Sequence, residues 1–205
     1  MITPTLPSAE AADLLARFAR LPAWPLEEQL RLSPGTLADY TALAPWHYRA
    51  GRPATIARIL RLAWPQDPHA APAAVLVESL PTLACHRRDQ ALGGRYTACP
   101  EARTRARLLY AELRCISRVI VHPQWRGLGL AVRLVRHALF TATTPYTEAF
   151  ARMGWLHPFF ALAGMTAYPP RDPPAARSSG RRPRPAPIYY LHDNTGSHHE
   201  TPARI

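Results

Sequence analysis

The spacing of apolar and polar residues predicts a series of short β-strands between residues 55 and 193. The alternation in "TIARILRLAW" is closer to a period of two than to one of 3.6 residues, which favours a strand over a helix. "RCISRVIV" is rich in β-branched residues, as expected of a strand buried on both faces. Further strands are predicted in "AAPAAVLVESL" (the 71–81 region), "YTEAFARM" (146–153), "MTAYPP" (165–170) and "IYYLHD" (188–193).

Helical spacing replaces this alternation in "RGLGLAVRLVRHALFTA" (126–142), where Leu130 and Leu134 fall on one face of a predicted helix. "PEARTRARLLYAEL" (100–113) predicts another helix. "HPFFALAG" (157–164) predicts a short helix that ends at a glycine. The alternation of strands with helices is typical of a mixed α/β domain built on one central sheet.

The remaining stretches define the predicted domain organisation. Residues 1–44 are expected to form an N-terminal helical extension, with Ser8 capping one helix and a second helix starting at Ser33-Pro34. Residues 45–193 form the α/β domain, in which 84–100 is expected to be irregular. Two further segments have loop or tail composition: a Pro/Arg-rich loop at 169–187 and a disordered tail at 194–205.

Composition narrows the class of protein. The chain has 205 residues, 47% of them hydrophobic, which is enough for a packed core. It contains no apolar run long enough to span a membrane and no secretory signal at its start, so we expect an intracellular, cytoplasmic protein with no membrane partner. The cysteines, at positions 85, 99 and 115, are too widely spaced for a disulfide framework. Even together with His86, they match no standard metal site, so no bound metal is expected.

The charge is strongly positive. The formal net charge is +11, and all 25 basic residues are arginine. One explanation is a compositional bias that enriches arginine, alanine and proline throughout the chain. The other is a surface that attracts polyanions, such as a nucleotide cofactor, a nucleic acid or an acidic partner. The sequence leaves both open, and it leaves the oligomeric state open as well, a homodimer included.

"QWRGLG" (124–129) lies between a predicted strand and a predicted helix, and its glycines raise the first functional hypothesis. The first amides of a helix have no internal partner and carry partial positive charge, so they bind anions, and glycine lets a phosphate approach the backbone closely. A P-loop is excluded because the chain has no lysine. The Rossmann pattern is not met because Val132 occupies the place of its third glycine. The pattern [Q/R]xxGx[G/A] is met in full.

At these residues the sequence resembles the GNAT superfamily of N-acetyltransferases. "SRVIVHPQWRGLGLAVRLVRHAL" is similar to their fourth strand, pyrophosphate loop and following helix, and "HPFFALAGM" is similar to their later short helix. The resemblance covers about residues 45–193. It implies a central mixed and splayed β-sheet flanked by helices, with acetyl-CoA as co-substrate in the split between the fourth and fifth strands. The implied cofactor-binding residues are Val119, Ile120, Val121, Arg126, Gly127, Leu128, Gly129, Leu130 and Ala131.

The resemblance also implies direct acetyl transfer to an amine acceptor, small or macromolecular. Such a transfer needs a group that removes a proton from the amine and a donor to the carbonyl oxygen. Many members use a tyrosine to protonate the leaving thiolate, but this chain has Phe160 at that position. Replacement candidates in this chain are Glu148, His157, Tyr146 and Tyr168. Ser117 and Arg118, on the predicted fourth strand, are within reach of the acceptor site.

"WHYRAGRP" (46–53) precedes the first predicted strand, in a region that commonly lines the acceptor site of this superfamily. Its aromatic and cationic side chains make His47 and Tyr48 candidate catalytic residues, and the same combination stacks bases and holds phosphates. The stretch is more distantly similar to phage Mom-type proteins that modify adenine in DNA, and to GNAT-like domains found alone or fused to ABC-type ATPases. Two alternatives to the acyltransferase therefore stay open: a nucleic-acid modification protein and a non-catalytic CoA-binding module.

Overall fold

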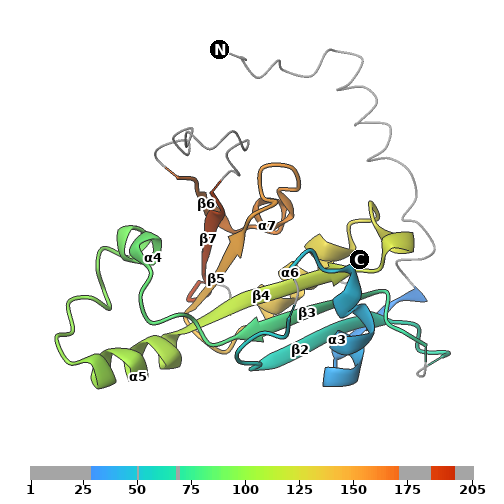
Figure 1. Ribbon diagram of the computed structural model, residues 1–205, viewed down its shortest axis with the longest axis horizontal. Coiled ribbons are helices and arrows are strands. Elements are labelled where there is room, and N and C mark those ends of the chain that lie inside the picture. The colour runs from blue at the N-terminus through green and yellow to red at the C-terminus, as the bar shows by residue number, and fades with distance from the viewer. Residues whose placement is uncertain (1–28, 50, 68–69, 171–185, 197–205) are drawn as a thin grey trace, which may run out of the picture.

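The structure is a computed structural model, and it describes residues 29–49, 51–67, 70–170 and 186–196. These residues build one sheet with the strand order β1-β2-β3-β4-β5-β7-β6 (Figure 1). Its strands are β1 (Arg31–Pro34), β2 (Arg58–Ala63), β3 (Ala74–Ser79), β4 (Leu113–Val121), β5 (Tyr146–Ala151), β6 (Thr166–Tyr168) and β7 (Ile188–Asp193). The helices are α3 (Leu37–Leu43), α4 (His86–Ala91), α5 (Ala102–Glu112), α6 (Leu130–Phe140) and α7 (Phe159–Leu162), with 3₁₀ turns η1 (Ala44–Trp46) and η2 (Pro123–Trp125).

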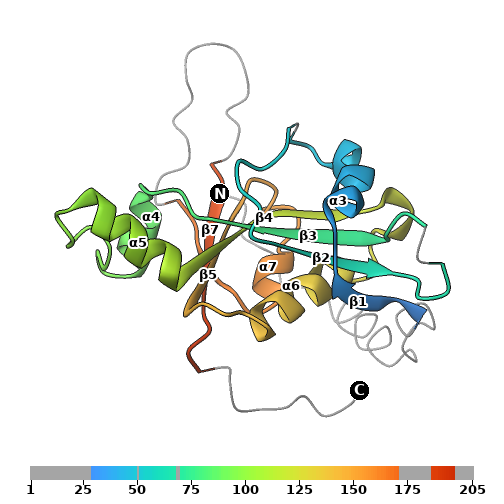
Figure 2. The same ribbon diagram turned by 90° about the horizontal axis from the view of Figure 1, so that it is seen from below.

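Helices cover both faces of this sheet, with α3 and α6 on opposite sides (Figure 2). Adjacent residues of β3 point to opposite faces, as the pleat of a strand requires. Leu76 packs in the core under α6 with Leu134, whereas Val75 packs with Leu43 of α3. A third cluster, around Tyr189, lies between β7 and the region of α4 and α5. The predicted mixed α/β fold with one central, flanked sheet is confirmed.

The strands and long helices predicted between residues 55 and 193 are present, but the N-terminal region differs from the prediction. Arg31–Pro34 is a strand paired antiparallel with β2, so the predicted start of the second helix, at Ser33-Pro34, is wrong. The helix begins at Leu37 because Thr36 and Asp39 form a capping box, in which each side chain accepts a hydrogen bond from the other's amide. Residues 31–43 are therefore part of the sheet and its covering layer. The helix predicted after Ser8 lies outside the described residues.

The second difference is α4, in the stretch 84–100 that was predicted to be irregular. Its N-terminus is capped by Cys85, whose Sγ accepts a hydrogen bond from the amide of Arg88. The helix has no apolar stripe, and what anchors it is the buried side chain of Arg88. A helix held by a buried charge instead of by periodic leucines gives no hydrophobic signal in the sequence.

The feature that positions the functional site is the junction between β4 and β5. It is the sheet's parallel pair, and its pairing runs only from Leu113 opposite Tyr146 to Ile116 opposite Ala149. After Ile116 the two strands separate, so the edge of β4 that faces the split has no strand partner there. The predicted splay of the sheet is thus confirmed.

A β-bulge in β4 coincides with the start of this split. Val77 of β3 pairs with Arg118, but the next residue, Glu78, pairs with Ile116, which leaves Ser117 as an extra residue in β4. Ile116 and Arg118 would share a face in a regular strand. Because of the bulge, Ile116 packs in the core under α6, and Arg118 lies opposite Val77 on the face that α3 covers.

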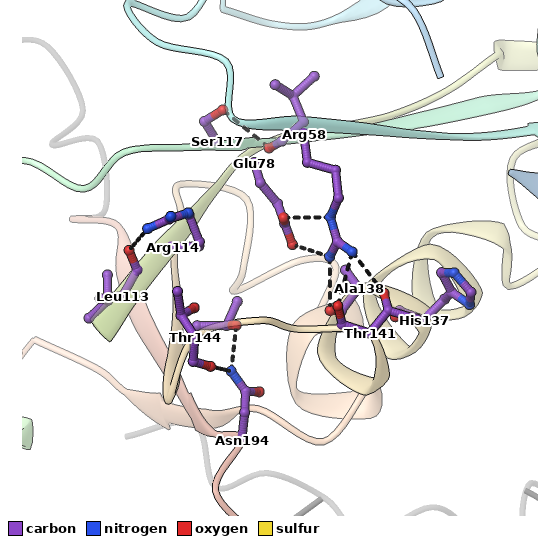
Figure 3. A network of polar contacts seen from close by, with 12 residues as sticks. Arg58, Glu78, Leu113, Arg114, Ser117, His137, Ala138, Thr141, Thr144 and Asn194 are labelled. Atoms are coloured by element: carbon purple, nitrogen blue, oxygen red, sulfur yellow. Dashed lines mark hydrogen bonds and ion pairs between the residues drawn. The ribbon is translucent and has the colours of Figure 1, made fainter. Parts of the chain in front are cut away.

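The C-terminal end of α6 is fixed by Arg58 of β2 (Figure 3). The guanidinium of Arg58 binds both carboxylate oxygens of Glu78, at 2.7 and 2.8 Å. Its remaining N–H groups donate to the carbonyl oxygens of Ala138 and Thr141, at 3.1 Å each. The Arg58 side chain therefore satisfies both the buried carboxylate of Glu78 and the free carbonyl groups at the C-terminal end of α6.

We expect Arg58→Met to lower the free energy of unfolding by about 1–3 kcal/mol, because the buried Glu78 loses its partner and the end of α6 loses two donors. Urea denaturation measures this change. Arg95→Met is the matched control, since Arg95 is exposed where it pairs with Glu112, and exposed pairs contribute about 0–1 kcal/mol. Equal losses in the two variants would contradict this role for Arg58.

Candidate active site

A cleft of about 650 Å³ opens at the split between β4 and β5. This volume is within the range of about 300–1,000 Å³ that is common for small-molecule sites. Its lining comes from the 46–48 segment, β4, the glycine loop with the start of α6, the end of β5 and the α7 region. The residues that line the cleft include Trp46, His47, Tyr48, Ser117, Arg118, Val119, Ile120, Val121, Trp125, Arg126, Gly127, Gly129, Leu130, Ala131, Phe150, Arg152, Met153, His157, Phe159 and Phe160.

The glycine loop forms an open anion seat at the N-terminus of α6. Gly127 and Gly129 have φ angles of +85° and +74°, a conformation that side-chain-bearing residues rarely adopt. A Cβ at either position would meet nothing within 4 Å, so the space beside the backbone is free. Among the described residues, the amides of Gly127, Leu128 and Gly129 donate no hydrogen bond. Unpaired amides with open space at a helix N-terminus fit a diphosphate.

Two neighbours hold this loop in place. The side chain of His122 accepts a hydrogen bond from the amide of Gln124 and caps the 3₁₀ turn η2. Arg126 donates from Nε to the carbonyl of Val121 at 3.2 Å and from Nη2 to that of Trp46 at 3.3 Å. The Arg126 guanidinium is therefore at the mouth of the seat and links it to the 46–48 segment.

The middle of the cleft is largely apolar. Val119 and Val121 line it from β4 and Phe159 lines it from α7, while the ring of Trp125 packs at a tilt against that of Trp64 with centroids 5.1 Å apart. Phe160 is buried, with its ring centroid 5.2 Å from that of Tyr190. Such apolar walls suit an extended ligand with little charge. The unpaired edge of β4 offers backbone N–H and C=O groups that can bind amide groups of such a ligand.

His47 lines the cleft from the 46–48 segment, next to Trp46, whose carbonyl accepts a hydrogen bond from Arg126. Its Nδ1 lies 3.2 Å from both the amide nitrogen and the carbonyl oxygen of Arg49, and its ring centroid lies 4.6 Å from that of Tyr48. In the tautomer whose Nδ1–H donates to that carbonyl, Nε2 is free to accept a proton. Burial lowers the pKa of His47 below its ordinary value, and the positive charges of Arg118 and Arg49 lower it further. The imidazole is therefore neutral at pH 7 and is able to accept a proton.

Arg118 lies beside His47, under the loop that follows α3. It is only 5% exposed. Its Nη1 donates to the carbonyl of Ser117 at 2.7 Å and its Nη2 to that of Gly51 at 3.3 Å, while its buried Nε has no partner. The sequence suggested Arg118 only as a residue within reach of the acceptor. Its burial and its effect on His47 are not visible in the sequence.

Ser117 and His157 both line the cleft, in different ways. The Ser117 hydroxyl shares a hydrogen bond of 2.6 Å with that of Ser79 and donates to the carbonyl of Val77 at 3.2 Å. It is thus engaged in holding the bulge, which gives it a positioning role. His157 is exposed in the turn before α7, where its amide donates to the carbonyl of Met153.

Glu148, a candidate base from the sequence, does not line the cleft. Its carboxylate is completely buried, binds Arg88 at 2.8 and 2.9 Å, and accepts a hydrogen bond from the hydroxyl of Tyr189 at 3.0 Å. Burial and the adjacent carboxylate raise the pKa of Tyr189, which keeps the phenol protonated as a donor. A carboxylate with these partners and no access to substrate cannot act as a base, so we do not propose it as one.

Tyr146 and Tyr168, the other sequence candidates, are also outside the cleft, packed in the cluster around Tyr189. Phe150 and Arg152 line it and were missed. Phe150 is at the end of β5, beyond the last residue of that strand that pairs with β4, where the two strands have separated. In the described part of the chain, no three side chains among His, Cys, Asp and Glu are grouped as a metal site requires. None of the helices described is both long and apolar enough to cross a bilayer.

No protein-family model matches this sequence, and no curated protein matches it either. Solved structures do. A spermidine N-acetyltransferase from Vibrio cholerae is 10% identical, with 83% of this chain and 96% of that chain covered and a TM-score of 0.52. A GNAT family N-acetyltransferase from Escherichia coli in complex with CoA is 10% identical over 83% of this chain and 84% of that one, at 0.46. An acyl-CoA N-acyltransferase described as putative, from Klebsiella pneumoniae, is 12% identical over 80% and 97%, at 0.46.

The fold is that of the GNAT N-acetyltransferases. The similarity to the Vibrio cholerae enzyme spans 83% of this chain and 96% of that one, and the split sheet with a glycine loop before α6 agrees with the resemblance in the sequence. The links to phage Mom-type proteins and to domains fused to ABC-type ATPases are tested by none of these comparisons and stay predictions.

Proposed function

We propose that the protein is an acyl-CoA-dependent N-acyltransferase that moves an acetyl group from acetyl-CoA directly to an amine acceptor. The observation that carries this proposal is the open amide seat at the start of α6, which opens into a cleft between separated strands. The spermidine N-acetyltransferase among the similar structures supports N-acetyl transfer as the class of reaction.

In this proposal the glycine loop binds the diphosphate of the co-substrate. The backbone amides of residues 127–131 point partial positive charge at it, and Arg126 adds a full charge at the mouth. The β4 edge at Val119, Ile120 and Val121 binds the amide-containing arm through backbone groups. Bound acetyl-CoA supplies the acetyl group as a thioester at the inner end of that arm.

His47 is the proposed base. The acceptor nitrogen attacks the thioester carbon as a neutral amine, the N–C bond forms, the C–S bond breaks and the thiolate leaves. His47 takes up the proton that the nitrogen loses, and Tyr48, stacked on the imidazole, keeps it oriented. An amide N–H on the free edge of β4 stabilises the charge that develops on the carbonyl oxygen. Phe160 has no proton to donate, so the thiolate is protonated by solvent.

Isothermal titration of CoA into the purified protein, followed by thiol release from acetyl-CoA in the presence of primary amines, tests the proposal. We expect binding of one CoA per chain and thiol release that depends on the amine. A wild-type protein that binds no CoA would refute the proposal.

We expect His47→Gln to lower kcat/KM at pH 7.5 about 100-fold, which is the lower range for loss of a general base. In the wild type, activity should fall as the pH drops through the pKa of His47, because protonated imidazole cannot accept a proton. Since that pKa is lowered, the midpoint should lie below the ordinary value of 6.5. His157→Gln is the matched control, and it should keep both the rate and the acid limb. If the acid limb persisted in His47→Gln, another group would be the base.

A further inference from the structure

We propose that the acceptor is a small amine that also carries an anionic group, a carboxylate or a phosphate, and that Arg118 determines this specificity. The inference rests on the proposed acyl transfer and names its substrate class. It follows from the charge of the cleft, from the burial of Arg118 and from the position of that residue beside the proposed base.

The cleft has a one-sided charge. Three arginines line it, at positions 118, 126 and 152, and its described lining contains no aspartate or glutamate. Arg126 is assigned above to the diphosphate of the co-substrate. Arg118 and Arg152 are therefore the arginines left to contact the acceptor. An acceptor with several positive charges would meet repulsion here and no carboxylate to offset it.

Arg118 lacks the partner that a buried charge normally has. The ion pairs between described residues involve Arg58, Arg61, Arg88 and Arg95, and Arg118 is in none of them. Two backbone carbonyls bind its Nη atoms, and its Nε–H has no acceptor. A guanidinium has five donors, so most of its hydrogen-bonding capacity is unused. Burying an unpaired charge is unfavourable, and an anionic group bound at the acceptor end would compensate for it.

The same charge favours the reaction. A positive charge near a titrating amine stabilises its neutral form, and only the neutral form has the lone pair that attacks the thioester. Burial is the main cause of the lowered pKa of His47, and the positive charge of Arg118 contributes to it in the same direction. Arg118 therefore orients the anionic end of the acceptor and helps to deprotonate its amine.

The dimensions favour a small molecule over a nucleic acid. The cleft volume of about 650 Å³ suits a drug-sized ligand. Arg118 is buried beneath the loop that contains Gly51, where the phosphates of a duplex do not reach.

The test compares amines that differ only in the anionic group. Wild-type protein saturated with acetyl-CoA is assayed with tyrosine against tyramine and with O-phosphoethanolamine against ethanolamine, which separates carboxylate from phosphate. Spermidine and a double-stranded DNA oligonucleotide complete the panel. We expect the anionic member of at least one pair to have a kcat/KM about tenfold to a hundredfold above its partner.

Variants of Arg118 identify the cause of the preference. Arg118→Gln should remove it by raising KM for the anionic amine about tenfold to a hundredfold, with CoA affinity unchanged. Arg118→Lys keeps the charge and should retain part of the preference, which also decides the question if Arg118→Gln does not fold. Arg61→Gln is the control, an arginine on β2, two strands away from β4 in the sheet, whose acidic partner is Asp39.

Several results would overturn the inference. These are equal rates within every pair, turnover of none of the pairs, a preference for spermidine, modification of the oligonucleotide alone, or a preference that survives in Arg118→Gln. CoA binding by the wild type separates the two proposals. With CoA bound, these results refute the anionic acceptor and leave acyl transfer standing, whereas a protein that binds no CoA refutes both.

Discussion

Gly129→Glu is expected to abolish CoA binding, with a loss of affinity of at least about 100-fold, or about 2.7 kcal/mol. The substitution adds a carboxylate at the N-terminus of α6, where the structure has free space beside the backbone. That space is where we propose that the diphosphate binds, so the variant places a negative charge against a ligand of the same sign. It also forces a side-chain-bearing residue into a φ of +74°.

Two variants separate charge from backbone strain. Gly129→Ala imposes only the strain of a left-handed backbone, about 1–2 kcal/mol, and should weaken binding much less than glutamate. Gly93→Glu is the matched control, because Gly93 also has positive φ and open surroundings but is outside the cleft. Titration of CoA with thermal unfolding of the same samples measures both effects. If Gly129→Glu bound CoA normally while folded, the diphosphate seat would be elsewhere.

The largest expected loss of stability comes from Glu148→Gln, at about 3–5 kcal/mol of unfolding free energy. Arg88, the buried residue that anchors α4, is only 1% exposed. The substitution leaves its guanidinium without a counter-charge. The hydroxyl of Tyr189 also loses its ionic acceptor. The double variant Arg88→Met/Glu148→Leu should cost less than Glu148→Gln, because it removes both charges together.

Equilibrium denaturation and activity, measured on the same samples, distinguish this structural role from a catalytic one. At a temperature where Glu148→Gln remains folded, we expect kcat to stay within about threefold of the wild type, because the residue is outside the cleft. A large loss of kcat with unchanged stability would instead restore Glu148 as a candidate base.

Local sequence patterns were sufficient to predict most elements of the fold and the position of the glycine loop at the start of α6. Alternation in "TIARILRLAW" predicted β2, and helical spacing predicted α6. This loop was predictable because it uses backbone amides, so its signature is a short run of residues with two glycines. His47 and Tyr48 were singled out for a similar reason, as neighbours in one unusual loop that the structure places at the cleft.

The features that local patterns missed depend on contacts between distant residues. Arg88 and Glu148 are 60 positions apart, so neither the helix that Arg88 anchors nor the burial of Glu148 is visible in a short window. Strand β1 owes its conformation to pairing with β2, which overrides the helix-starting tendency of Ser33-Pro34. The unpaired state of Arg118 emerges only when the loop after α3 folds over β4.

The extra residue at Ser117 has an evolutionary consequence for acceptor choice. It puts the two halves of β4 out of phase, so the half ending at Ile116 contributes to the core under α6 while position 118 is released from it. Under the proposed acceptor specificity, mutations at position 118 would change substrate preference without altering the core under α6. Descendants of this scaffold could diversify toward new amines by changing that one position while the coenzyme loop stays constant.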